Sequence, residues 1–421
     1  LRAQQVELDL LTLDRRKRIE IQRLAGPVVL DGRPDEPCWE QIRRLPLIMM
    51  TPRFGDSPLD RTEVLVGFDD DHLYVGAVLY DGEPEGIQAT TKKRDASTSS
   101  TDWFGIILDT FCDKENVLAF FTNPSGLRFD AHVYNDAQPR LPGELPINTS
   151  WNTFWDAAAA RDSRGWSVEM RIPHSSIRFQ PVDGKVVMGF AAKRWIARKN
   201  EMHIFPAIRP DWGEMSSWKA SQCQEVEFKG LALCRPAHVT PYILFGRSRT
   251  NALNQEETEY LREDKTEFNG GLDVKYGLTS NLTLDITVNT DFAQVEADDA
   301  QVNMTRFSLF FPEKRVFFQE RSSNFEFSLG GPDTLFYSRR IGLADDRIVP
   351  IFGGVRLVGR LGGWDVGLLD MQTAPLDKLP SENFGVLRIR RRILNPFSYV
   401  GGIVTSRIGT DGAANVAYGL D

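Results

Sequence analysis

The chain has 421 residues, a formal net charge of −8 and a sequence pI near 5.4. This charge argues against a general nucleic-acid binder, which needs a basic surface to neutralise phosphates. An apolar fraction of 41% and a charged fraction of 26% are ordinary, so the length fits two or three domains with sizeable cores.

Two features of the sequence bear on membrane insertion and on export. No apolar run reaches the roughly 18 residues that a membrane-spanning helix needs. The start, LRAQQVELDL, has no hydrophobic signal core. The junction after Ala3 is either the scar of a signal-peptidase cut or a ragged chain end, and residues 1–23 are interpreted as an N-terminal extension.

Residues 24–233 are typical of a β-sandwich. Short apolar segments are separated by turn signals about every ten residues. One short helix is expected at 36–45, with Asp35 as its N-cap and Pro37 in its first turn. The predicted strands are at 62–68, 73–80, 102–110, 116–126, 165–173 and 186–196.

Residues 234–421 have a different pattern, in which longer segments alternate apolar residues with Gly, Thr, Asn or charge. That length and two-residue period favour membrane-spanning barrel strands, apolar toward lipid and polar toward the lumen. A second soluble sandwich or barrel is the alternative. The polar stretch 251–267 is expected to be an exposed loop. The predicted strands are at 268–277, 282–290, 351–361, 363–373, 384–394 and 398–409.

Four cysteines are present, without the spacing of a zinc site. Cys223 and Cys234 flank a predicted strand–turn–strand. They form either a disulfide in an oxidising compartment or two buried free thiols.

The first half resembles the family 9 carbohydrate-binding modules in their diverged, family 9-like form. Five segments carry the resemblance in order: VVLDGRPDEPCW, TEVLVGFDDDHLYVGAVLYD, DWFGIILDT, GWSVEMRIPHSSI and GFAAKR. It implies a sandwich over roughly residues 24–230 and a carbohydrate ligand, although diverged members can lack sugar binding.

The second half resembles a bacterial outer-membrane family that carries such a module before a β-barrel domain of unknown function. The matching stretch is NTDFAQVEADDAQVNMTRFSLFFPEKRVFFQE, residues 289–320. Members of that family are longer, so residues 234–421 are interpreted as a partial antiparallel barrel of the outer-membrane type.

A long insertion at 291–345 interrupts the predicted barrel strands, and loops of this size are usually functional. It is expected either to fold into the barrel mouth or lumen, or to cap the junction with the first domain. Its signature residues are Asp291, Phe292, Glu296, Arg306, Phe310, Phe311, Pro312, Glu313, Lys314, Arg315 and Phe318.

Sugar binding needs aromatic rings that stack on a pyranose. The segments SWNTFWD and RPDWGEMSSW are predicted to be loops with exposed rings. The candidates are Trp151, Trp155, Trp212 and Trp218, together with Trp103, and core or interface packing is the alternative for each.

Other chemistry has less support. Asp69, Asp70 and Asp71 in FDDDH form either a calcium site or a solvated hairpin turn. No nucleophile motif, P-loop or dinucleotide motif is present, so no catalytic residue is assigned. A glycoside hydrolase would need two suitably spaced carboxylates.

Three hypotheses follow. The first is an outer-membrane barrel protein whose module, in the periplasm or at the cell surface, binds a glycan. The second is a structural subunit of an envelope or surface assembly, and the third is a polysaccharide hydrolase. The expected partners are a glycan, outer-membrane lipid and other envelope proteins, but not nucleic acid.

Overall fold

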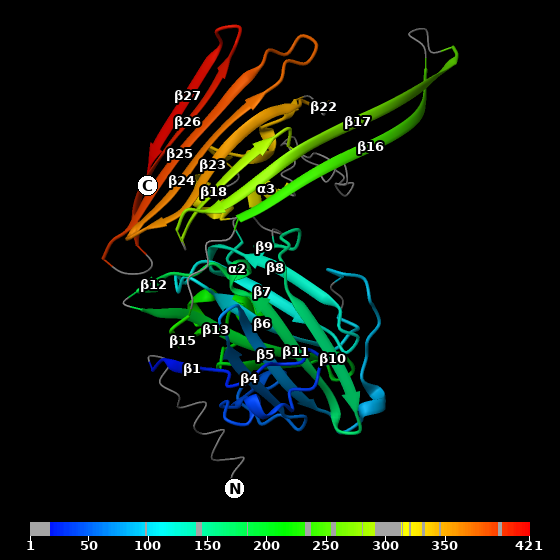
Figure 1. Ribbon diagram of the computed structural model, residues 1–421, viewed down its shortest axis with the longest axis vertical. Helices are drawn as coiled ribbons and strands as arrows, with labels where there is room; N and C mark the ends of the chain where they lie inside the picture. Colours follow the sequence, from blue (N-terminus) through cyan, green and yellow to red (C-terminus); the bar gives the residue numbers. More distant parts are fainter. Residues whose placement is uncertain are drawn as a thin grey trace. The chain divides into compact units, whose positions relative to one another are not determined.

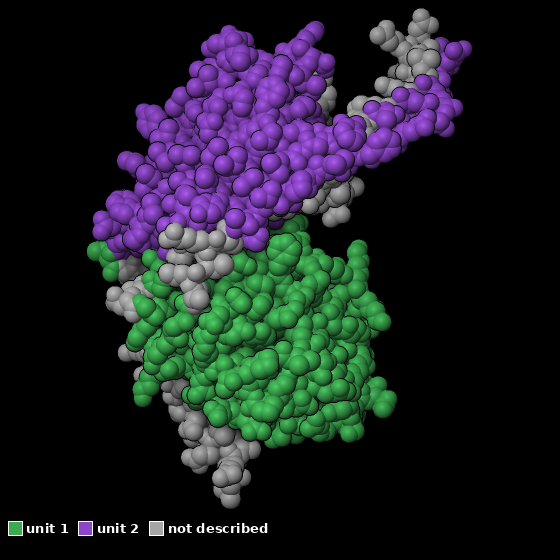
Figure 2. All heavy atoms as spheres, in the orientation of Figure 1, with its two compact units in different colours: residues 1–234, 394–398 green, residues 235–393, 399–421 purple. Residues whose placement is uncertain are grey.

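The computed structural model describes residues 17–96, 99–139, 145–182, 184–231, 237–253, 258–279, 281–290, 313, 315–319, 321–330, 333–344, 347–394 and 398–421. The chain divides into two compact units (Figure 2). Unit 1 comprises residues 1–234 and 394–398, and unit 2 comprises residues 235–393 and 399–421. Strands dominate both units, which confirms the predicted all-β class.

Unit 1 contains two sheets joined by β1 (Ile19–Arg23), which pairs in parallel with β15 and with β4 (Figure 1). Sheet B has the order β10-β11-β5-β4-β1, with β2 beside β4. Its other strands are β2 (Leu45–Pro46), β4 (Thr62–Phe68), β5 (His72–Tyr80), β10 (Asp156–Asp162) and β11 (Gly165–Pro173).

Sheet A has the order β1-β15-β13-β6-β7-β8-β9, with β12 and β14 beside β13 and β3 beside β14. A single α-helical turn, α2 (His174–Ile177), follows β11. The strands of sheet A are β3 (Ile48–Thr51), β6 (Trp103–Asp109), β7 (Val117–Thr122), β8 (Arg128–Val133), β9 (Ile147–Asn148), β12 (Pro181–Val182), β13 (Lys185–Ile196), β14 (Glu201–Phe205) and β15 (Gln224–Lys229).

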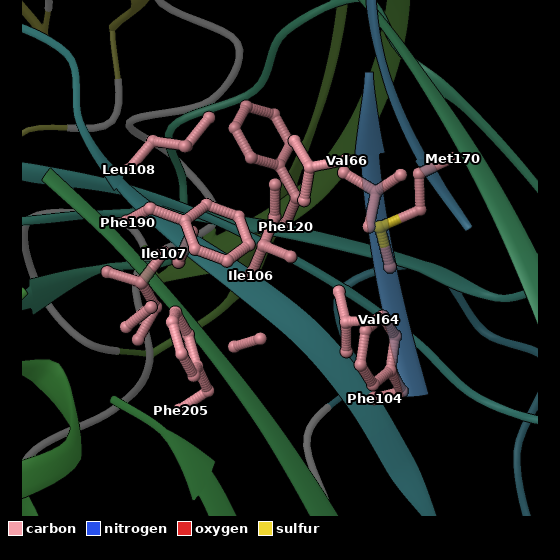
Figure 3. Close-up of a cluster of buried hydrophobic side chains, with 14 of the residues drawn as sticks. Val64, Val66, Phe104, Ile106, Ile107, Leu108, Phe120, Met170, Phe190 and Phe205 are labelled. Atoms are coloured by element: carbon pink, nitrogen blue, oxygen red, sulfur yellow. The ribbon is translucent and has the colours of Figure 1, made fainter. Parts of the chain in front are cut away.

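The core of unit 1 lies between these sheets (Figure 3). Val66 of β4 and Met170 of β11 belong to sheet B, and Ile106 of β6 and Phe190 of β13 belong to sheet A. All four are at most 3% exposed. Alternate residues of a strand point to opposite faces, so each sheet contributes one apolar row to this core.

The helix predicted at 36–45 is wrong. The structure has only a 3-10 turn, Pro37–Trp39, whose N-cap is Glu36 rather than Asp35. This segment buries Trp39 and Ile42 in a small cluster with Leu65 of β4 and then enters β2. The strands predicted in the first half are confirmed as β4, β5, β6, β7, β11 and β13.

Unit 2 is one sheet of eight antiparallel strands in chain order, β16-β17-β18-β23-β24-β25-β26-β27. Figure 1 shows β23 to β27 side by side. The strands are β16 (Ala237–Leu253), β17 (Tyr260–Gly277), β18 (Leu282–Val288), β23 (Ile351–Leu361), β24 (Trp364–Thr373), β25 (Glu382–Arg392), β26 (Tyr399–Gly409) and β27 (Ala414–Leu420).

The expected loop at 251–267 is wrong for its described residues, because β16 and β17 pair continuously out to Leu253 and Tyr260. The polar composition of this stretch is compatible with a hairpin exposed to solvent. The strands predicted from 268 onward are confirmed.

The described part of the chain between β18 and β23 packs against one face of the sheet of unit 2, which we call the inner face. Phe317 and Phe318 of α3 (Val316–Gln319) share a cluster with Leu369 of β24 and Val386 of β25. The other short elements described in this insertion are the 3-10 turns η7 (Ser322–Phe325) and η8 (Ser338–Arg340) and the strands β19 (Ser328–Gly330), β20 (Asp333–Thr334), β21 (Leu343–Ala344) and β22 (Arg347–Ile348). Among the described residues, none of the helices is long and apolar enough to cross a membrane.

The packing in unit 1 yields a test at Gly105 of β6. A Cβ there would lie 2.2 Å from the Phe121 ring, which is held by Phe129 (centroids 6.2 Å apart) and Trp218 (5.4 Å). Gly105→Ala is therefore expected to lower the free energy of unfolding by about 1–3 kcal/mol. Urea unfolding followed by tryptophan fluorescence measures it. Gly26→Ala, whose Cβ would make an ordinary 3.8 Å contact, is the control, and equal stabilities of the two variants would contradict this account.

Candidate functional site

The tryptophans predicted to bind sugar differ in exposure. Trp155 (2% exposed) and Trp103 (9%) are buried, whereas Trp151 and Trp218 are half-buried. Trp212 is 48% exposed and is the most accessible of the five. The five rings therefore do not form one exposed platform.

Trp151 and Trp155 both pack edge-on against Phe120 of β7, with ring centroids 6.1 and 5.4 Å away. The expectation that Trp155 is exposed in a loop is wrong, because the Trp155 ring packs against Phe120 and is buried. Nothing in the sequence SWNTFWD indicates that its two tryptophans are buried or half-buried rather than exposed at the surface.

Trp103 and Trp218 lie at the ends of an aromatic row on the outer face of sheet A. Ring centroids are 6.4 Å apart for Trp103 and Phe129, 6.2 Å for Phe129 and Phe121, and 5.4 Å for Phe121 and Trp218. Lys193 of β13 covers the end of this row, with Nζ 3.3 Å from the Trp218 ring centre.

Lys193 is nine-tenths buried, and its Nζ also lies 3.3 Å from Ser217 Oγ. Burial lowers the pKa of this amine well below its usual value. Because Lys193 occupies one face of Trp218, that ring offers little free surface for a sugar.

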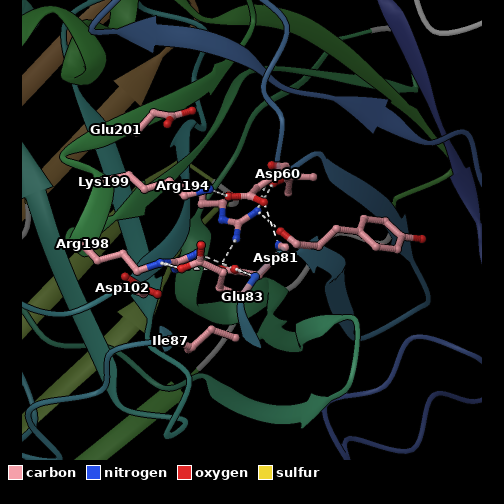
Figure 4. Close-up of polar contacts among 12 residues, drawn as sticks. Asp60, Asp81, Glu83, Ile87, Asp102, Arg194, Arg198, Lys199 and Glu201 are labelled. Carbon is pink, nitrogen blue, oxygen red and sulfur yellow. Dashed lines mark hydrogen bonds and ion pairs between the residues drawn. The ribbon is translucent and has the colours of Figure 1, made fainter. Parts of the chain in front are cut away.

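A buried charge network joins the two sheets around Arg194 of β13, which is 1% exposed (Figure 4). Its Nη1 donates to the Tyr80 carbonyl (2.9 Å) and to Thr62 Oγ1 (3.1 Å). Burial lowers the pKa of Arg194 to about 10, while the nearby carboxylates of Asp60 and Asp81 act in the opposite direction.

The same network extends to the next turn of chain. Arg198 donates to both oxygens of Asp81, and Lys199 donates to Asp60. Asp102 Oδ1 accepts the Ala197 amide at 2.8 Å. Through these contacts the network ties β4 and β5 to β13.

Glu169 of β11 holds the segment that carries the GRPDEPCW motif. It is fully buried, and its carboxylate accepts the backbone amides of Asp31 (3.1 Å) and Gly32 (3.0 Å). Burial, followed by the negative charge of Glu36, raises the pKa of Glu169 to about 7. A carboxylate without solvent access cannot protonate a glycosidic oxygen, so this group gives no support to the hydrolase hypothesis.

A cleft of about 440 Å³ opens over the outer face of sheet B, beside this motif segment. Residues 33–44 form one side, and the turn between β10 and β11 forms the other. Val78 and Tyr80 of β5 lie at its floor.

The FDDDH segment forms the turn between β4 and β5. Asp69 Oδ1 accepts the amides of Asp71 (2.8 Å) and His72 (2.7 Å), and Asp70 pairs with Arg23. Among the described residues, no group of three or more acidic, His or Cys side chains is arranged to hold a metal. Asp69 therefore has a turn-capping role, and the calcium prediction gains no support here.

The sheet of unit 2 has a reversed burial pattern. Directly paired residues form an apolar row across all eight strands on the face opposite the insertion, which we call the outer face. Several members are well exposed, at 42% for Tyr276, 38% for Leu368, 40% for Leu387 and 46% for Val404. The row consists of Ala237, Tyr276, Leu284, Leu357, Leu368, Leu387, Val404 and Tyr418.

The inner face of the same sheet buries charge. Arg356 and Arg388 are each 1% exposed, and Asp285 is 2% exposed. Arg356 Nη1 lies 3.0 Å from Asp285 Oδ2, and the guanidinium of Arg388 lies 5.2 Å from the Phe327 ring centre. The insertion therefore supplies rings to the faces of buried guanidinium groups.

Three signature residues of the insertion fall within the described residues. Arg315 is 1% exposed, pairs with Glu313 (2.8 Å), donates to the Ile341 carbonyl (2.7 Å) and lies 4.2 Å from the Phe318 ring centre. The other signature residues lie outside the described residues: Asp291, Phe292, Glu296, Arg306, Phe310, Phe311, Pro312 and Lys314.

Cys223 is a free thiol in the structure. Burial raises its pKa well above the usual value. Cys234 lies outside the described residues, so the Cys223–Cys234 disulfide stays a prediction.

Comparison with known proteins finds one family model and four chains of solved structures. Residues 240–349 match a family described as a domain of unknown function (DUF5916). No curated protein matches the chain.

One similar structure is a family 9 carbohydrate-binding module from Caldicellulosiruptor kristjanssonii in complex with cellotriose. It is 19% identical, with 51% of this chain and 95% of that chain covered and a TM-score of 0.35. Another is a candidate carbohydrate-binding protein from Bacteroides uniformis, 8% identical, with 51% and 99% covered and a TM-score of 0.40. At these values the likeness does not extend to a ligand or a site.

The raised pKa of Glu169 predicts a pH dependence of stability. The pKa of Glu169 in the folded state (about 7) exceeds the ordinary value of 4.5. Between pH 4.5 and about 7, the folded state therefore keeps a proton on Glu169 that the unfolded state has released. The free energy of unfolding should therefore fall as pH rises from about 4.5 to about 7. Glu169→Gln should flatten this slope, whereas Glu214→Gln, at an exposed position, should not. Urea unfolding from pH 4 to 8 measures the slopes, and the same slope in both variants would refute the assignment.

Proposed function

We propose that this chain is an outer-membrane protein of the β-barrel type whose N-terminal sandwich binds carbohydrate in the periplasm or at the cell surface. The carrying observation is the reversed burial in unit 2, where the apolar row is exposed and the arginines are buried. A sheet with its outer face in water would carry mainly polar side chains on that face.

A bilayer suits this sheet for two physical reasons. Lipid takes apolar side chains, and strands β17, β18 and β23 to β26 of this sheet each have a paired strand on both sides, as backbone amides within a bilayer require. Strands β23 to β26 have ten or eleven residues each, the length that crosses a bilayer when tilted.

The outer face also changes character along the strands. At one end Trp364 lies beside Arg391, whose guanidinium is 5.1 Å from the ring centre. At the other end Asp370 lies beside Asn383, which donates to it at 3.3 Å. An aromatic residue at one boundary and polar residues at both are features of the interfacial bands of membrane sheets.

Carbohydrate binding by unit 1 rests on the five motif segments, which lie in family order within the observed sandwich. Cellotriose, the ligand of the Caldicellulosiruptor module, is a reasonable first neutral probe. A contact role with other envelope proteins is the competing proposal for unit 1.

The membrane proposal predicts the effect of charge on the outer face. Leu368→Arg and Leu387→Arg should each destabilise the chain folded in phospholipid vesicles, lowering its free energy of unfolding by about 2–4 kcal/mol, because the guanidinium would enter hydrocarbon. Leu59→Arg, at a 94% exposed position in unit 1, is the matched control. The proposal would be contradicted if the chain were monomeric in buffer without detergent and both outer-face variants were as stable as the parent chain.

The carbohydrate proposal predicts saturable binding of at least one glycan to the full chain in detergent micelles, measured first on a glycan array and then by calorimetry. Release of new reducing ends during the incubation would instead indicate a hydrolase. A folded chain that binds no glycan would favour contacts with envelope proteins.

A further inference from the structure

We propose that the cleft over sheet B is a subsite for a neutral oligosaccharide. This inference rests on the proposed carbohydrate-binding function and gives it a place other than the predicted tryptophans. The volume of about 440 Å³ lies within the range of small-molecule sites. Four of the five predicted tryptophans are buried or half-buried, whereas this cleft is open to solvent along its charged rim.

The floor of the cleft is built by strand pairing. Gly165, Ser167 and Val78 share the outer face of sheet B with Tyr80, because directly paired residues point the same way. The guanidinium of Arg61 lies 4.2 Å from the Tyr80 ring centre and holds that ring in place. The result is a small floor that carries one aromatic ring, of which Arg61 covers one face.

One wall is fixed by the motif segment. Glu169 binds the amides of Asp31 and Gly32, and Ser167 Oγ donates to the Gly32 carbonyl at 2.6 Å. Gly32 has φ +90°, and a Cβ there would lie 2.7 Å from the backbone of Ala159. These contacts hold the neighbouring residues Arg33 to Glu36 at the mouth of the cleft.

The rim carries free hydrogen-bonding groups. Within the described part of the chain, the side chains of Arg33, Asp35 and Glu40 have no hydrogen-bond or ion-pair partner, and all three are exposed. In contrast, Arg164 is paired to Asp162 at 2.7 Å across the opposite rim. A planar guanidinium and two carboxylates are thus available to a ligand that both donates and accepts hydrogen bonds.

The charge of the lining identifies the class of ligand. Arg33, Arg44 and Arg164 supply three positive charges, and four carboxylates share the lining, those of Asp35, Glu36, Glu40 and Asp162. This near balance gives no net attraction for an acidic polymer. Sugar hydroxyls can accept from guanidinium and donate to carboxylate, so a neutral saccharide matches the mixed rim.

The test uses the full chain in detergent micelles, with cellotriose and trigalacturonate as neutral and acidic probes beside a wider glycan array. Arg33→Ala and Glu40→Ala should each weaken binding of a neutral saccharide at least tenfold in calorimetry. Trp212→Ala and Arg53→Ala, an exposed arginine away from the cleft lining, should leave it unchanged. Urea unfolding checks that every variant keeps the stability of the parent chain.

The outcomes separate the two proposals. Neutral-glycan binding that survives both cleft variants but is lost in Trp212→Ala would overturn the cleft and keep the carbohydrate function. Binding of acidic glycans alone would overturn the neutral class. A folded chain that binds nothing on the array would overturn the carbohydrate function itself, and the cleft with it.

Discussion

Both units bury guanidinium groups, and each such charge must find its partners inside the fold. In unit 1, Arg194 lies between the sheets and reaches carbonyls and carboxylates around β4 and β5. In unit 2, Arg356 and Asp285 are directly paired across β23 and β18. A register slip of one residue would move each arginine to the other face and separate these pairs. Buried charge therefore selects strand neighbours and register, which backbone hydrogen bonds alone do not distinguish.

The motif segments of the first half have a structural meaning in this chain. The glutamate of GWSVEMRIP holds the backbone of VVLDGRPDEPCW through the amides of Asp31 and Gly32, and Trp39 packs over Gly76 of β5. Two segments that are far apart in sequence thus form one contact on the outer face of sheet B. Such motifs identify a fold because they stabilise it. The ligand that the fold binds is determined by other side chains around the site.

The strands could be predicted from the sequence because alternation and turn signals are local. Exposure could not, because it depends on which face another segment covers. Trp155 and Trp212 occur in similar loop-like strings, yet Phe120 buries the first and the second stays exposed. The apolar row on Leu284, Leu368 and their neighbours was predictable as a face, but only the structure reveals the paired arginines opposite it. The segment 36–45 has helical spacing, and tertiary burial of Trp39 overrides it.

The string RFSLFFPEKRVFFQE mixes rings with charges, and its described residues, 313 and 315–319, show how both are used. Phe317 and Phe318 cover Leu369 and Val386. Phe325 and Phe327 lie over the guanidinium groups of Arg356 and Arg388, whose carboxylate partners are Asp285 of β18 and Asp421 after β27. Within the insertion, the buried guanidinium of Arg315 pairs with Glu313 and lies against the Phe318 ring. Aromatic faces accept both aliphatic neighbours and guanidinium planes, so phenylalanine is suited to a surface that carries both. The inner face therefore buries both apolar side chains and paired charges, and the phenylalanines of the insertion contact both kinds.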